Sequence, residues 1–390
     1  MVSLTEALRL VLSAARPGGS EKIAIEDCLN RVLADDISSD LDMPPFNKAA
    51  MDGFACRMAD LKNELVEIEN LPAGVFPKKR IESNKCARIM TGGVVPDGAD
   101  CVIKIEDTEK TTNGSVRFLS AKTAKNICLK GEDIKKGEII LTHGQLLKSQ
   151  HIGLLSTVGC TQPPVACRAM VGIIATGNEI VQPSRSPQQA KIRDSNSIPL
   201  LTQVKSMGAD ARYFGIAPDT EEAIDEKFEQ ARRDCDVIIF TGGVSMGDYD
   251  LVPVVLKKRG IKILFEKVRV KPGNPTKFGI VEDIPCFGLP GNPVASFIMF
   301  ELLVKPLLYK MMGHHFTPLK ITGILGETVR KKKTDRESII PVYFSNGKIY
   351  PTEYHGPAHT GSLLNAGGLI SMPVGMRELQ QGSSIMVRLL

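Results

Sequence analysis

The spacing of apolar residues changes along the chain, and each change predicts a different kind of structure. Apolar positions from Leu4 to Ala15 recur on one helical face, between a capping-box sequence at residues 3–6 and a Pro-Gly-Gly stop at residues 17–19. From about residue 41 to residue 141 the pattern becomes short β-type runs broken by glycine, proline, asparagine and aspartate. We therefore expect an N-terminal helix followed by a separate β-rich domain.

Strand-like and helix-like segments alternate after a break at Pro163-Pro164. Continuous apolar runs predict buried strands at residues 171–175, 237–240 and 285–289, with helices between them and a last helix from Pro293. This alternation indicates βαβ units and a mostly parallel sheet, so the fold class is α/β.

The C-terminal part returns to short strands after about Thr317, and Asn346-Gly347 is a strong hairpin signal within it. A small β domain or barrel is therefore expected there. A chain of 390 residues is also too long for one ordinary core, which favours roughly two to four domains.

The composition is that of a folded protein, and it makes nucleic acid an unlikely partner. Aromatic residues make up 5% of the chain and tryptophan is absent, which argues against a stacking surface for nucleic acid. The net charge of +5 is spread along the chain, with a tight basic run at Lys331-Lys332-Lys333. We expect that run to be a solvated turn, with contact to an anionic ligand as the less favoured alternative.

The nine cysteines include no Cys-x-x-Cys pair, and an odd number cannot be fully paired within one chain. A reduced, cytoplasmic location fits this pattern best. No apolar run reaches the ~18 residues needed to cross a bilayer, and the N-terminus has no basic leader, so we expect neither export nor membrane insertion.

Three glycine-containing turns follow predicted strands, at residues 176–179, 241–243 and 290–292. Ligands of parallel sheets bind outside the carboxyl ends of the strands, so all three turns can face one crevice. Glycine lets backbone N–H groups approach an anion closely, and helix starts add a positive dipole end. The sequence therefore predicts a site for an anionic, nucleotide-like ligand.

Several polar residues near these turns allow both a structural and a functional interpretation. Asp194 or Ser195 fits a helix cap, and the same helix start could also bind an anion. Asp248 and Asp250 could hold Mg²⁺ or simply cap the next helix, with neither reading favoured. Glu179 could bind a ribose or pterin N–H group or be exposed.

Other candidates carry weaker signals. Lys271 and Lys277 flank a Gly-Asn-Pro turn and could neutralise a phosphate, although most loop lysines are solvated. Asp52 lies in a turn whose composition gives no reason to prefer catalysis. No nucleophile triad or zinc spacing stands out, and His314-His315 and the pair His355 and His359 are weak metal candidates.

Eight segments, taken together and in order, resemble the molybdopterin molybdenumtransferases, the MoeA and gephyrin E-domain family. They span nearly the whole chain and comprise residues 44–55, 88–93, 131–133, 176–179, 194–196, 241–250, 271–273 and 289–296. The resemblance implies a multidomain fold around a MogA-like doubly wound α/β domain. The implied domains are a helical linking domain (1–40 with 140–168), a β-rich domain with Asp52 (41–139), the molybdopterin-binding α/β domain (169–316) and a C-terminal β-barrel (317–390).

The resemblance also implies a reaction and its partners. Such an enzyme takes adenylylated molybdopterin and molybdate, cleaves the pyrophosphate with Mg²⁺, releases AMP and leaves molybdenum on the dithiolene. It implies a homodimer whose active site is shared between subunits, and the adenylylating enzyme as a further partner. Molybdate and pyrophosphate are anions, so the transition state needs a cation and fixed donors more than a nucleophile.

Functional residues follow from the resemblance position by position. It assigns catalytic roles to Asp52, Asp133, Glu179, Asp219 and Lys271, and metal binding to Asp248 and Asp250. It assigns binding of the substrate to Thr91, Asp194, Ser195, Asn196, Thr241, Gly242, Gly243, Ser245, Pro272, Gly273, Lys277, Pro290, Gly291, Asn292, Ser296, Arg336 and Ser362.

The chain departs from the family pattern at three places. Asn274 stands where many members repeat a lysine, Thr220 stands where a second aspartate is common, and Gly361-Ser362-Leu363 replaces a usual Ser-Ser pair. Lys277 could supply the charge that Asn274 lacks.

Two other functions compete with metal insertion. The α/β domain also resembles smaller relatives that adenylylate molybdopterin, but those generally lack the Asp52 domain and the C-terminal barrel. A non-catalytic scaffold, known for one family member, would predict a long linker and a fused partner domain. Tungstate remains open as the oxyanion, because it is a tetrahedral dianion of nearly the same size as molybdate.

Overall fold

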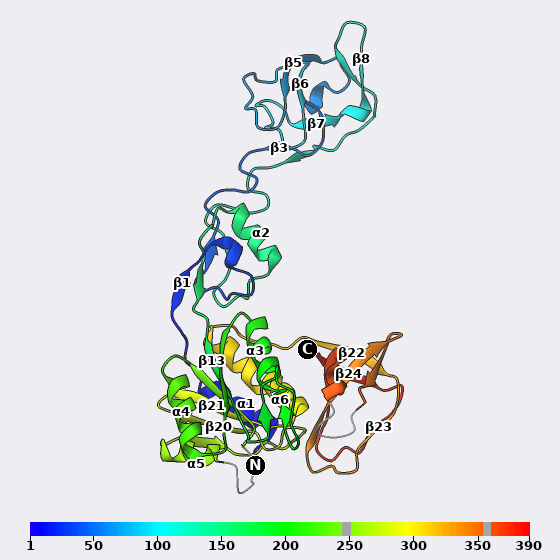
Figure 1. Cartoon of the computed structure of the whole chain (residues 1–390). Helices are drawn as coiled ribbons and strands as arrows, with labels where there is room; N and C mark the ends of the chain where they lie inside the picture. Colours follow the sequence, from blue (N-terminus) through cyan, green and yellow to red (C-terminus); the bar gives the residue numbers. More distant parts are fainter. Residues whose placement is uncertain (244–250, 354–359) are drawn as a thin grey trace. The chain divides into compact units, whose positions relative to one another are not determined.

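The computed structural model describes every residue of the chain except 244–250 and 354–359 (Figure 1). The chain divides into two compact units. The main unit contains Met1–Asp35, His143–Ser149 and Gln162–Leu390, and the β unit contains Asp36–Thr142 and Gln150–Thr161. Outside the two gaps, no helix is both long and apolar enough to cross a membrane.

A six-stranded sheet forms the centre of the main unit. In spatial order its strands are β16 (Asp210–Ala217), β13 (Met170–Thr176), β17 (Val237–Thr241), β21 (Ile284–Leu289), β20 (Lys277–Val281) and β18 (Lys262–Phe265). The first four are parallel, and β20 runs antiparallel to both of its neighbours. The turns after β13, β17 and β21 therefore leave the same edge of the sheet.

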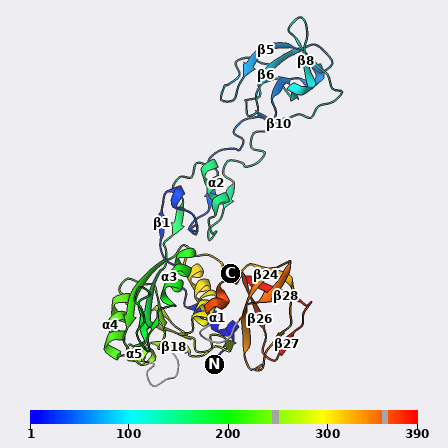
Figure 2. The same ribbon diagram turned by 45° about the vertical axis from the view of Figure 1, so that its right-hand side comes forward.

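Helices cover both faces of this sheet because its central strands are apolar on both faces. In β17, Ile239 shares a core with Leu200 of α3, whereas Ile238 shares the opposite core with Phe228 of α4. Figure 1 and Figure 2 show α4 and α5 on one side of the sheet and α3 on the other. The helices are α1 (Leu4–Ser13), α3 (Ser197–Ser206), α4 (Glu221–Arg232), α5 (Val252–Lys258), α6 (Pro293–Met299), the π-helical η4 (Phe300–Val304) and α7 (Lys305–Met311).

The first helix begins where the capping box predicts. The Ser3 hydroxyl accepts a hydrogen bond from the Glu6 backbone N–H at 3.1 Å. Ala7 and Val11 on the apolar face of α1 are fully buried in the core that also contains α3 and α6. The periodicity therefore predicted both the helix and its buried face.

The C-terminal strands close into a barrel (orange to red in Figure 1). The order β24, β25, β22, β28 and β26 is closed by pairing of β26 with β24, and Val342 and Val387 are fully buried inside. The short β19 adds to β24 in parallel. The bounds are β19 (Val270–Lys271), β22 (Lys320–Leu325), β24 (Glu337–Ser345), β25 (Lys348–Pro351), β26 (Gly368–Met372) and β28 (Ser384–Leu389), with β23 (Val329–Arg330), β27 (Glu378–Leu379) and η5 (Thr360–Leu363) between them.

The β unit is built on a four-stranded sheet in the order β5, β6, β4 and β7. Phe54 on β4 packs into one small core and Ala55 into a second one on the other face. The elements are β2 (Ile37–Ser38), β3 (Lys48–Ala49), β4 (Gly53–Cys56), η2 (Met58–Asp60), β5 (Val66–Leu71), β6 (Lys85–Ile89), β7 (Cys101–Lys104), η3 (Ile105–Asp107), β8 (Thr108–Lys110), β9 (Val116–Phe118), β10 (Ile127–Cys128), β11 (Ile139–Leu141) and α2 (Ser149–Thr157). The remaining elements of the main unit are β1 (Ser20–Lys22), η1 (Ile25–Asp27), β12 (Pro164–Ala166), β14 (Ile180–Val181) and β15 (Ile192–Arg193).

The predicted fold class is confirmed: a mostly parallel, doubly wound sheet, a β-rich part and a small C-terminal barrel occur in one chain. The three predicted buried strands correspond to β13, β17 and β21. The boundaries of the four expected domains stay a prediction.

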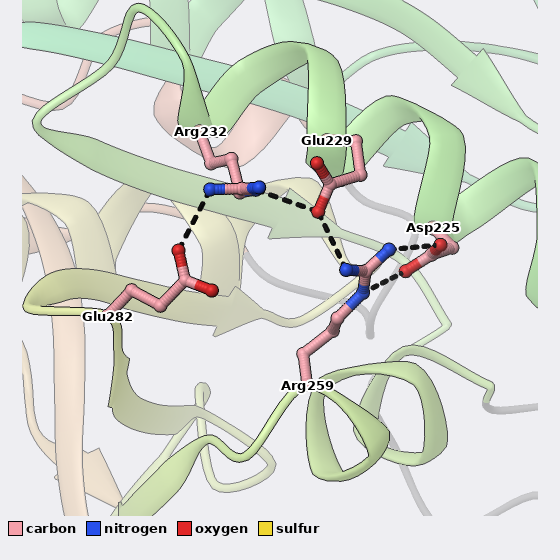
Figure 3. Close-up of polar contacts among 5 residues, drawn as sticks. All are labelled: Asp225, Glu229, Arg232, Arg259 and Glu282. Carbon is pink, nitrogen blue, oxygen red and sulfur yellow. Dashed lines mark hydrogen bonds and ion pairs between the residues drawn. The ribbon is translucent and has the colours of Figure 1, made fainter.

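A charged network fastens α5 to α4 and to the β20–β21 turn (Figure 3). The Arg259 guanidinium, just after α5, donates two hydrogen bonds to the Asp225 carboxylate, at 2.7 and 2.6 Å. Its third nitrogen lies 2.9 Å from Glu229, which also accepts from Arg232 at 2.7 Å. Arg232 in turn donates to Glu282 at 2.9 Å. This network holds the helix that follows residues 244–250.

We expect Arg259→Ala to lower the melting temperature at pH 7 by on the order of 2–4 °C. The Arg259 hydrogen bonds lower the pKa of Asp225, and those of Arg232 lower the pKa of Glu229. Carboxyl groups with lowered folded pKa values stabilise the fold above their unfolded pKa, and this stability is lost as pH falls through the folded pKa. Thermal melts from pH 7 to pH 3 should therefore show the difference between variant and parent shrinking.

The matched control is Arg9→Ala, which removes a lone exposed ion pair with Glu6 on α1. It should leave the melting temperature nearly unchanged, since isolated surface pairs contribute little. An Arg259→Ala deficit that is independent of pH would show that the network contributes by packing alone.

Candidate active site

The turns after β13 and β17 are in direct contact at the carboxyl edge of the sheet. Gly242 has a φ of +86°, and a Cβ atom there would lie 2.3 Å from the Thr176 carbonyl oxygen. Gly243 has a φ of +55°, and a Cβ atom there would lie 2.4 Å from the Thr176 hydroxyl. Only glycine fits both positions without displacing the β13 turn. A Cβ on Gly291 would lie 3.8 Å from the Gly242 Cα, so the turn after β21 adjoins the same place.

Asn196 joins the start of α3 to two of these turns. Its side-chain N–H₂ group donates to the Thr241 hydroxyl at 2.8 Å and to the Gly291 carbonyl at 2.9 Å. The residue is buried, and its side-chain oxygen has no hydrogen-bond partner in the described part of the chain. A buried unpaired acceptor is unfavourable unless a ligand supplies a donor.

The buried Asp194 carboxylate is hydrogen-bonded at the start of α3. One oxygen accepts from the backbone N–H groups of Asn196 and Ser197, at 3.1 and 3.0 Å. The other accepts from the Tyr213 hydroxyl at 2.8 Å. Burial and then the Asp194 charge raise the pKa of Tyr213, so the hydroxyl stays a donor. The N-cap residue itself is Asn196, so the prediction of Asp194 or Ser195 as N-cap is wrong in position, although the Asp194 carboxylate accepts from the N–H groups at the helix start. Ser195 is exposed beside it.

Asp219 lies in the loop after β16 and is hydrogen-bonded to the turn after β13, which contains Glu179. The Asp219 carboxylate accepts from the Asn178 backbone N–H at 2.8 Å, and the Asn178 side chain accepts from the Asp219 N–H at 3.1 Å. This exchange fixes the turn, so Asp219 has a positioning role here. Glu179 is exposed, and its carboxylate lies so close to Gly177 that a Cβ there would be 2.7 Å from it.

A pocket of about 390 Å³ lies between α3 and α6, and we call it the α3–α6 pocket. Predicted residues Ser195, Asn196 and Ser296 line it, together with Gln203 and Leu363. The buried side-chain oxygens of Asn196, Gln203 and Ser296 have no hydrogen-bond partner among the described residues. Its walls are otherwise largely apolar, so it suits a planar heterocycle with several N–H groups.

The turn that enters α6 is closed by its own asparagine. The Asn292 side-chain oxygen accepts from the backbone N–H groups of Val294 and Ala295, at 3.0 and 3.4 Å. Pro290 is buried before it, and Gly291 is exposed. Of the predicted binding residues in this turn, Asn292 therefore fixes the backbone conformation. Gly291 is the exposed residue that a ligand could contact.

Lys271 lies in a second pocket, of about 490 Å³, between its own turn and the barrel. Lys332 and Lys333 also line this pocket and are exposed. Lys331 differs from them, because its ammonium donates to the carbonyls of Arg336, Met372 and Pro373 at 3.0–3.2 Å. Burial lowers the pKa of Lys331. Within the basic run, Lys331 is therefore structural, and its two neighbours add positive charge beside Lys271.

The Lys271 turn explains one departure from the family pattern. Gly273 has a φ of +106°, and a Cβ there would lie 2.5 Å from the Met299 sulfur. The Asn274 side chain donates to the Val268 carbonyl at 2.7 Å, so it closes the turn instead of supplying charge. Lys277, on β20, lines a different cavity with Val252 and Pro253 on the α5 side. Pro272 lines the Lys271 pocket itself.

Two predicted barrel residues carry unsatisfied polar atoms. Ser362 is buried in η5 and its hydroxyl has no hydrogen-bond partner in the described residues. The Arg336 Nε also lacks a hydrogen bond, although it lies 3.4 Å from the Asp335 carboxylate. Both atoms are buried donors without a hydrogen bond among the described residues.

In the β unit, the structure pairs Asp52 with Thr91. One Asp52 oxygen accepts from both the Thr91 hydroxyl and the Thr91 backbone N–H, each at 2.7 Å. The Thr91 hydroxyl, followed by its N–H, lowers the pKa of Asp52, so this exposed carboxylate is held ionised. Asp133 is exposed, and its backbone N–H donates to the Met43 carbonyl at 3.1 Å.

Some predicted positions lie outside the described residues: Ser245, Asp248, Asp250, His355 and His359. Among the residues that are described, no group of three or more His, Cys, Asp or Glu side chains could hold a metal ion. One weak metal candidate has another partner, because a His314 ring nitrogen lies 2.8 Å from the Gly144 carbonyl.

Sequence reasoning missed Tyr213 and Gln203, and it did not single out the Thr176 side chain. The Thr176 hydroxyl is buried at Gly243 without a hydrogen-bond partner in the described residues. Gln203 offered one signal, since a polar residue among the inward-facing positions of an amphipathic helix departs from the pattern. Tyr213 offered none, because its contact with Asp194 depends on strand pairing.

Fold and site together define an enzyme-like α/β protein with a substrate crevice at the carboxyl edge of its sheet. Residues 2–159 match the family described as "MoeA N-terminal region (domain I and II)", and residues 172–310 match the "Probable molybdopterin binding domain". The chain is 34% identical to the molybdopterin molybdenumtransferase of Bacillus subtilis strain 168, over 100% of this chain and 94% of that protein. It is 33% identical to that of Staphylococcus epidermidis, over 98% and 94%.

A solved structure agrees over the full length. The molybdopterin biosynthesis moeA protein of Pyrococcus horikoshii OT3 superposes with a TM-score of 0.87 at 31% identity, covering 100% of both chains. This chain therefore belongs to the molybdopterin molybdenumtransferase family and is a transferase of molybdenum cofactor biosynthesis.

Proposed function

We propose that the protein inserts molybdate into adenylylated molybdopterin, cleaving the pyrophosphate bond and releasing AMP. The observation that carries this proposal is the α3–α6 pocket, because the buried side-chain oxygens of its lining residues Asn196, Gln203 and Ser296 lack donors among the described residues. Asn196 also donates to Thr241 and Gly291, which connects the pocket to the turns after β17 and β21. A pterin ring supplies N–H donors for such acceptors. The turns beside it would receive the phosphate groups through exposed backbone.

The proposed reaction consumes one water and releases two. Hydrolysis of the phosphoanhydride breaks a P–O bond, consumes water and releases AMP. The two dithiolene sulfurs then form bonds to molybdenum and displace two of its oxygens, which leave as water with the thiol protons and protons from solvent. The net products are the molybdenum cofactor, AMP and one water. Lys271, Lys332 and Lys333 would attract the molybdate dianion. The buried donors of Arg336 and Ser362 are further proposed contacts of the substrate.

The proposed reaction uses a magnesium ion that would be held partly by substrate. Asp194 and Asp219 are already hydrogen-bonded to backbone N–H groups, which leaves Glu179 as the exposed carboxylate of the described crevice. Asp248 and Asp250 would be the metal ligands, and Mg²⁺ typically takes one or two carboxylates plus phosphate oxygens. When bound, the ion would neutralise charge on the phosphoryl oxygens.

We also propose a cytoplasmic homodimer that shares each active site between subunits. In that arrangement the ionised Asp52, oriented by Thr91, and the exposed Asp133 act on substrate held by the partner. Tungstate is an alternative oxyanion, and the enzyme that adenylylates molybdopterin is a proposed partner.

The test is AMP release from adenylylated molybdopterin by the purified protein with Mg²⁺, with and without molybdate and with tungstate in parallel. Oxyanion-dependent AMP release with formation of active cofactor supports insertion and ranks the two oxyanions. Adduct formation from molybdopterin and ATP would instead assign the protein to the adenylylating class. The absence of both activities would favour a molybdopterin-binding scaffold.

We expect Asp250→Asn to reduce AMP release by roughly 100-fold or more, because a lost metal ligand removes several kcal/mol of charge stabilisation. Steady-state AMP release across a Mg²⁺ titration measures the effect, with a melting curve to confirm folding. Glu222→Gln, on the exposed face of α4, is the matched control and should retain parental turnover. Near-normal release by Asp250→Asn would remove Asp250 from the metal shell.

A further inference from the structure

The β unit contains a broad hollow of about 590 Å³ that we call the basic basin. Its lining includes the cations Lys78, Lys79, Arg80 and Lys130 and a single acidic residue, Asp97. The phenyl rings of Phe46 and Phe76 also line it, and Phe76 is 76% exposed. None of these residues belongs to the crevice of the main unit.

Hydrogen bonds to the backbone fix the walls of the basic basin. The Glu69 carboxylate accepts from the backbone N–H groups of Lys78 at 3.0 Å and Lys79 at 3.1 Å. The Ile81 N–H donates to the Asp97 carbonyl at 2.8 Å, which joins the two sides. Because the backbone is held in this way, the cations project from a defined frame instead of a loose loop.

Two of the four cations are available to a ligand. The Lys79 ammonium donates to the Ile68 carbonyl at 2.7 Å, and that of Lys130 lies 3.5 Å from Asp42. The side chains of Lys78 and Arg80 are exposed at the hollow, and the Arg80 charge also acts on the nearby Glu82 carboxylate. Cations gathered around one hollow raise the local positive potential, which favours a bound anion. A guanidinium and an ammonium together match a phosphate group.

The aromatic rings indicate what accompanies the phosphate. A phenylalanine as exposed as Phe76 is unusual beside four charged residues, and it offers a flat apolar face. Phe46 offers a second ring at the same hollow. A planar base stacks on such faces, and the volume lies within the range of ligand pockets. The combination fits a nucleoside monophosphate better than an inorganic anion.

The basin lies on the same two segments that hold Asp52 and Thr91. The Ala49 N–H donates to the Gly93 carbonyl, and the Val95 N–H donates to the Asn47 carbonyl, each at 2.9 Å. These bonds pair the segment from Asn47 to Asp52 with the segment from Thr91 to Val95. A ligand in the basin would therefore contact the strands that orient the Asp52 carboxylate.

We propose that the basic basin binds a nucleoside monophosphate, with its phosphate at Lys78 and Arg80 and its base on Phe46 and Phe76. This proposal rests on the proposed function, whose reaction supplies adenylate as part of the substrate and as a product. Binding at this place would hold or receive the adenylate beside Asp52.

Hydrogen exchange of the full chain, measured by mass spectrometry with AMP, tests the proposal. We expect AMP to protect peptides covering residues 45–47, 76–80 and 94–97, with weaker protection by inorganic phosphate or adenosine at equal concentration. The double variant Lys78→Glu and Arg80→Glu should weaken this protection at least tenfold in an AMP titration. Phe76→Ala should reduce the preference for AMP over inorganic phosphate. Lys62→Glu, an exposed lysine of the β unit outside the basin, should change neither.

The outcomes separate this proposal from the proposed reaction. Protection at residues 241–243 and 290–296 without protection at the basin would overturn the basin as a nucleotide site and leave the main-unit site intact. Equal protection by AMP and inorganic phosphate would overturn the assignment of the base to the rings. Basin protection in a protein that releases no AMP from adenylylated molybdopterin would support the basin and reject the reaction.

Discussion

Replacing Gly242 by alanine should abolish the proposed AMP release and lower the free energy of unfolding by about 2–4 kcal/mol. Two effects add at this position. A left-handed φ of +86° costs an alanine about 1–2 kcal/mol. Its methyl group would also sit 2.3 Å from the Thr176 carbonyl oxygen, which is backbone and cannot rotate away. The β13 and β17 turns must therefore separate, and that displaces the Thr241 hydroxyl from Asn196. Urea denaturation and AMP release measure the two effects.

Gly260→Ala is the matched control for backbone strain. Gly260 has a φ of +75°, similar to that of Gly242, but an added Cβ would meet no atom within 4 Å. It should lose about 1–2 kcal/mol from the left-handed backbone and keep its turnover. If both variants lose equal stability and Gly242→Ala still turns over, contact between the turns is not what the glycine is needed for.

The layout of the main unit was predictable because its strands are buried on both faces. A parallel strand covered by helices on each side reads as a continuous apolar run, as in Val237 to Phe240. The glycine turns were predictable for a related reason, since the carboxyl ends of such strands share one edge. Local chemistry also gave the N-cap at Ser3 and, to within two residues, the start of α3, whose N-cap is Asn196. These features depend on residues close together in the sequence.

The long-range contacts of the site could not be predicted in the same way. Asn196 reaches the Gly291 carbonyl, and Asp194 reaches the Tyr213 hydroxyl. Both contacts depend on the order of the strands in the sheet and on how far each turn extends beyond the sheet edge. The periodicity of apolar residues gives neither. Asn274 shows the same limit, because its side chain closes a turn at a position where the family pattern suggests a charge. The carbonyl within reach of its side-chain amide decides its role.

The three turns and the helix α3 form one mechanical unit at this edge. Gly242 lets the β17 turn lie on the β13 turn, which places the Thr241 hydroxyl against Asn196. Asp194 fixes the first turn of α3, so the Asn196 side chain cannot follow if the turns move. The unpaired Asn196 oxygen is therefore held in one position before any ligand arrives. Such preorganisation reduces the entropy that is lost when a ligand binds and orders the site.

Asn196→Asp should be the most informative change in this unit, because it replaces one N–H₂ group by oxygen and keeps the shape. The new oxygen would face the Gly291 carbonyl, another acceptor, in a buried site. An ionised carboxylate there lacks a partner, so we expect about 3–5 kcal/mol lower stability at pH 7 and at least tenfold weaker molybdopterin binding. Asn196→Ala should lose only about 1–3 kcal/mol, because it leaves acceptors unpaired without adding charge.

The pH dependence of Asn196→Asp distinguishes charge from lost packing. Only the protonated carboxyl can donate to the Gly291 carbonyl, so the folded protein should raise the pKa of the introduced group above about 4. An acid with a raised folded pKa has its full stability below the unfolded pKa, and it loses stability as pH rises toward the folded pKa. Relative to the parent, the variant should therefore be least impaired near pH 4 and most impaired at pH 8. Thr241→Val in a double-mutant cycle with Asn196→Asp then isolates the contribution of the Thr241 hydroxyl contact. A stability deficit of Asn196→Asp that stays constant with pH would contradict the prediction. It would mean that the Gly291 carbonyl turns away from the new carboxylate and that the backbone of the crevice is not fixed by its hydrogen bonds.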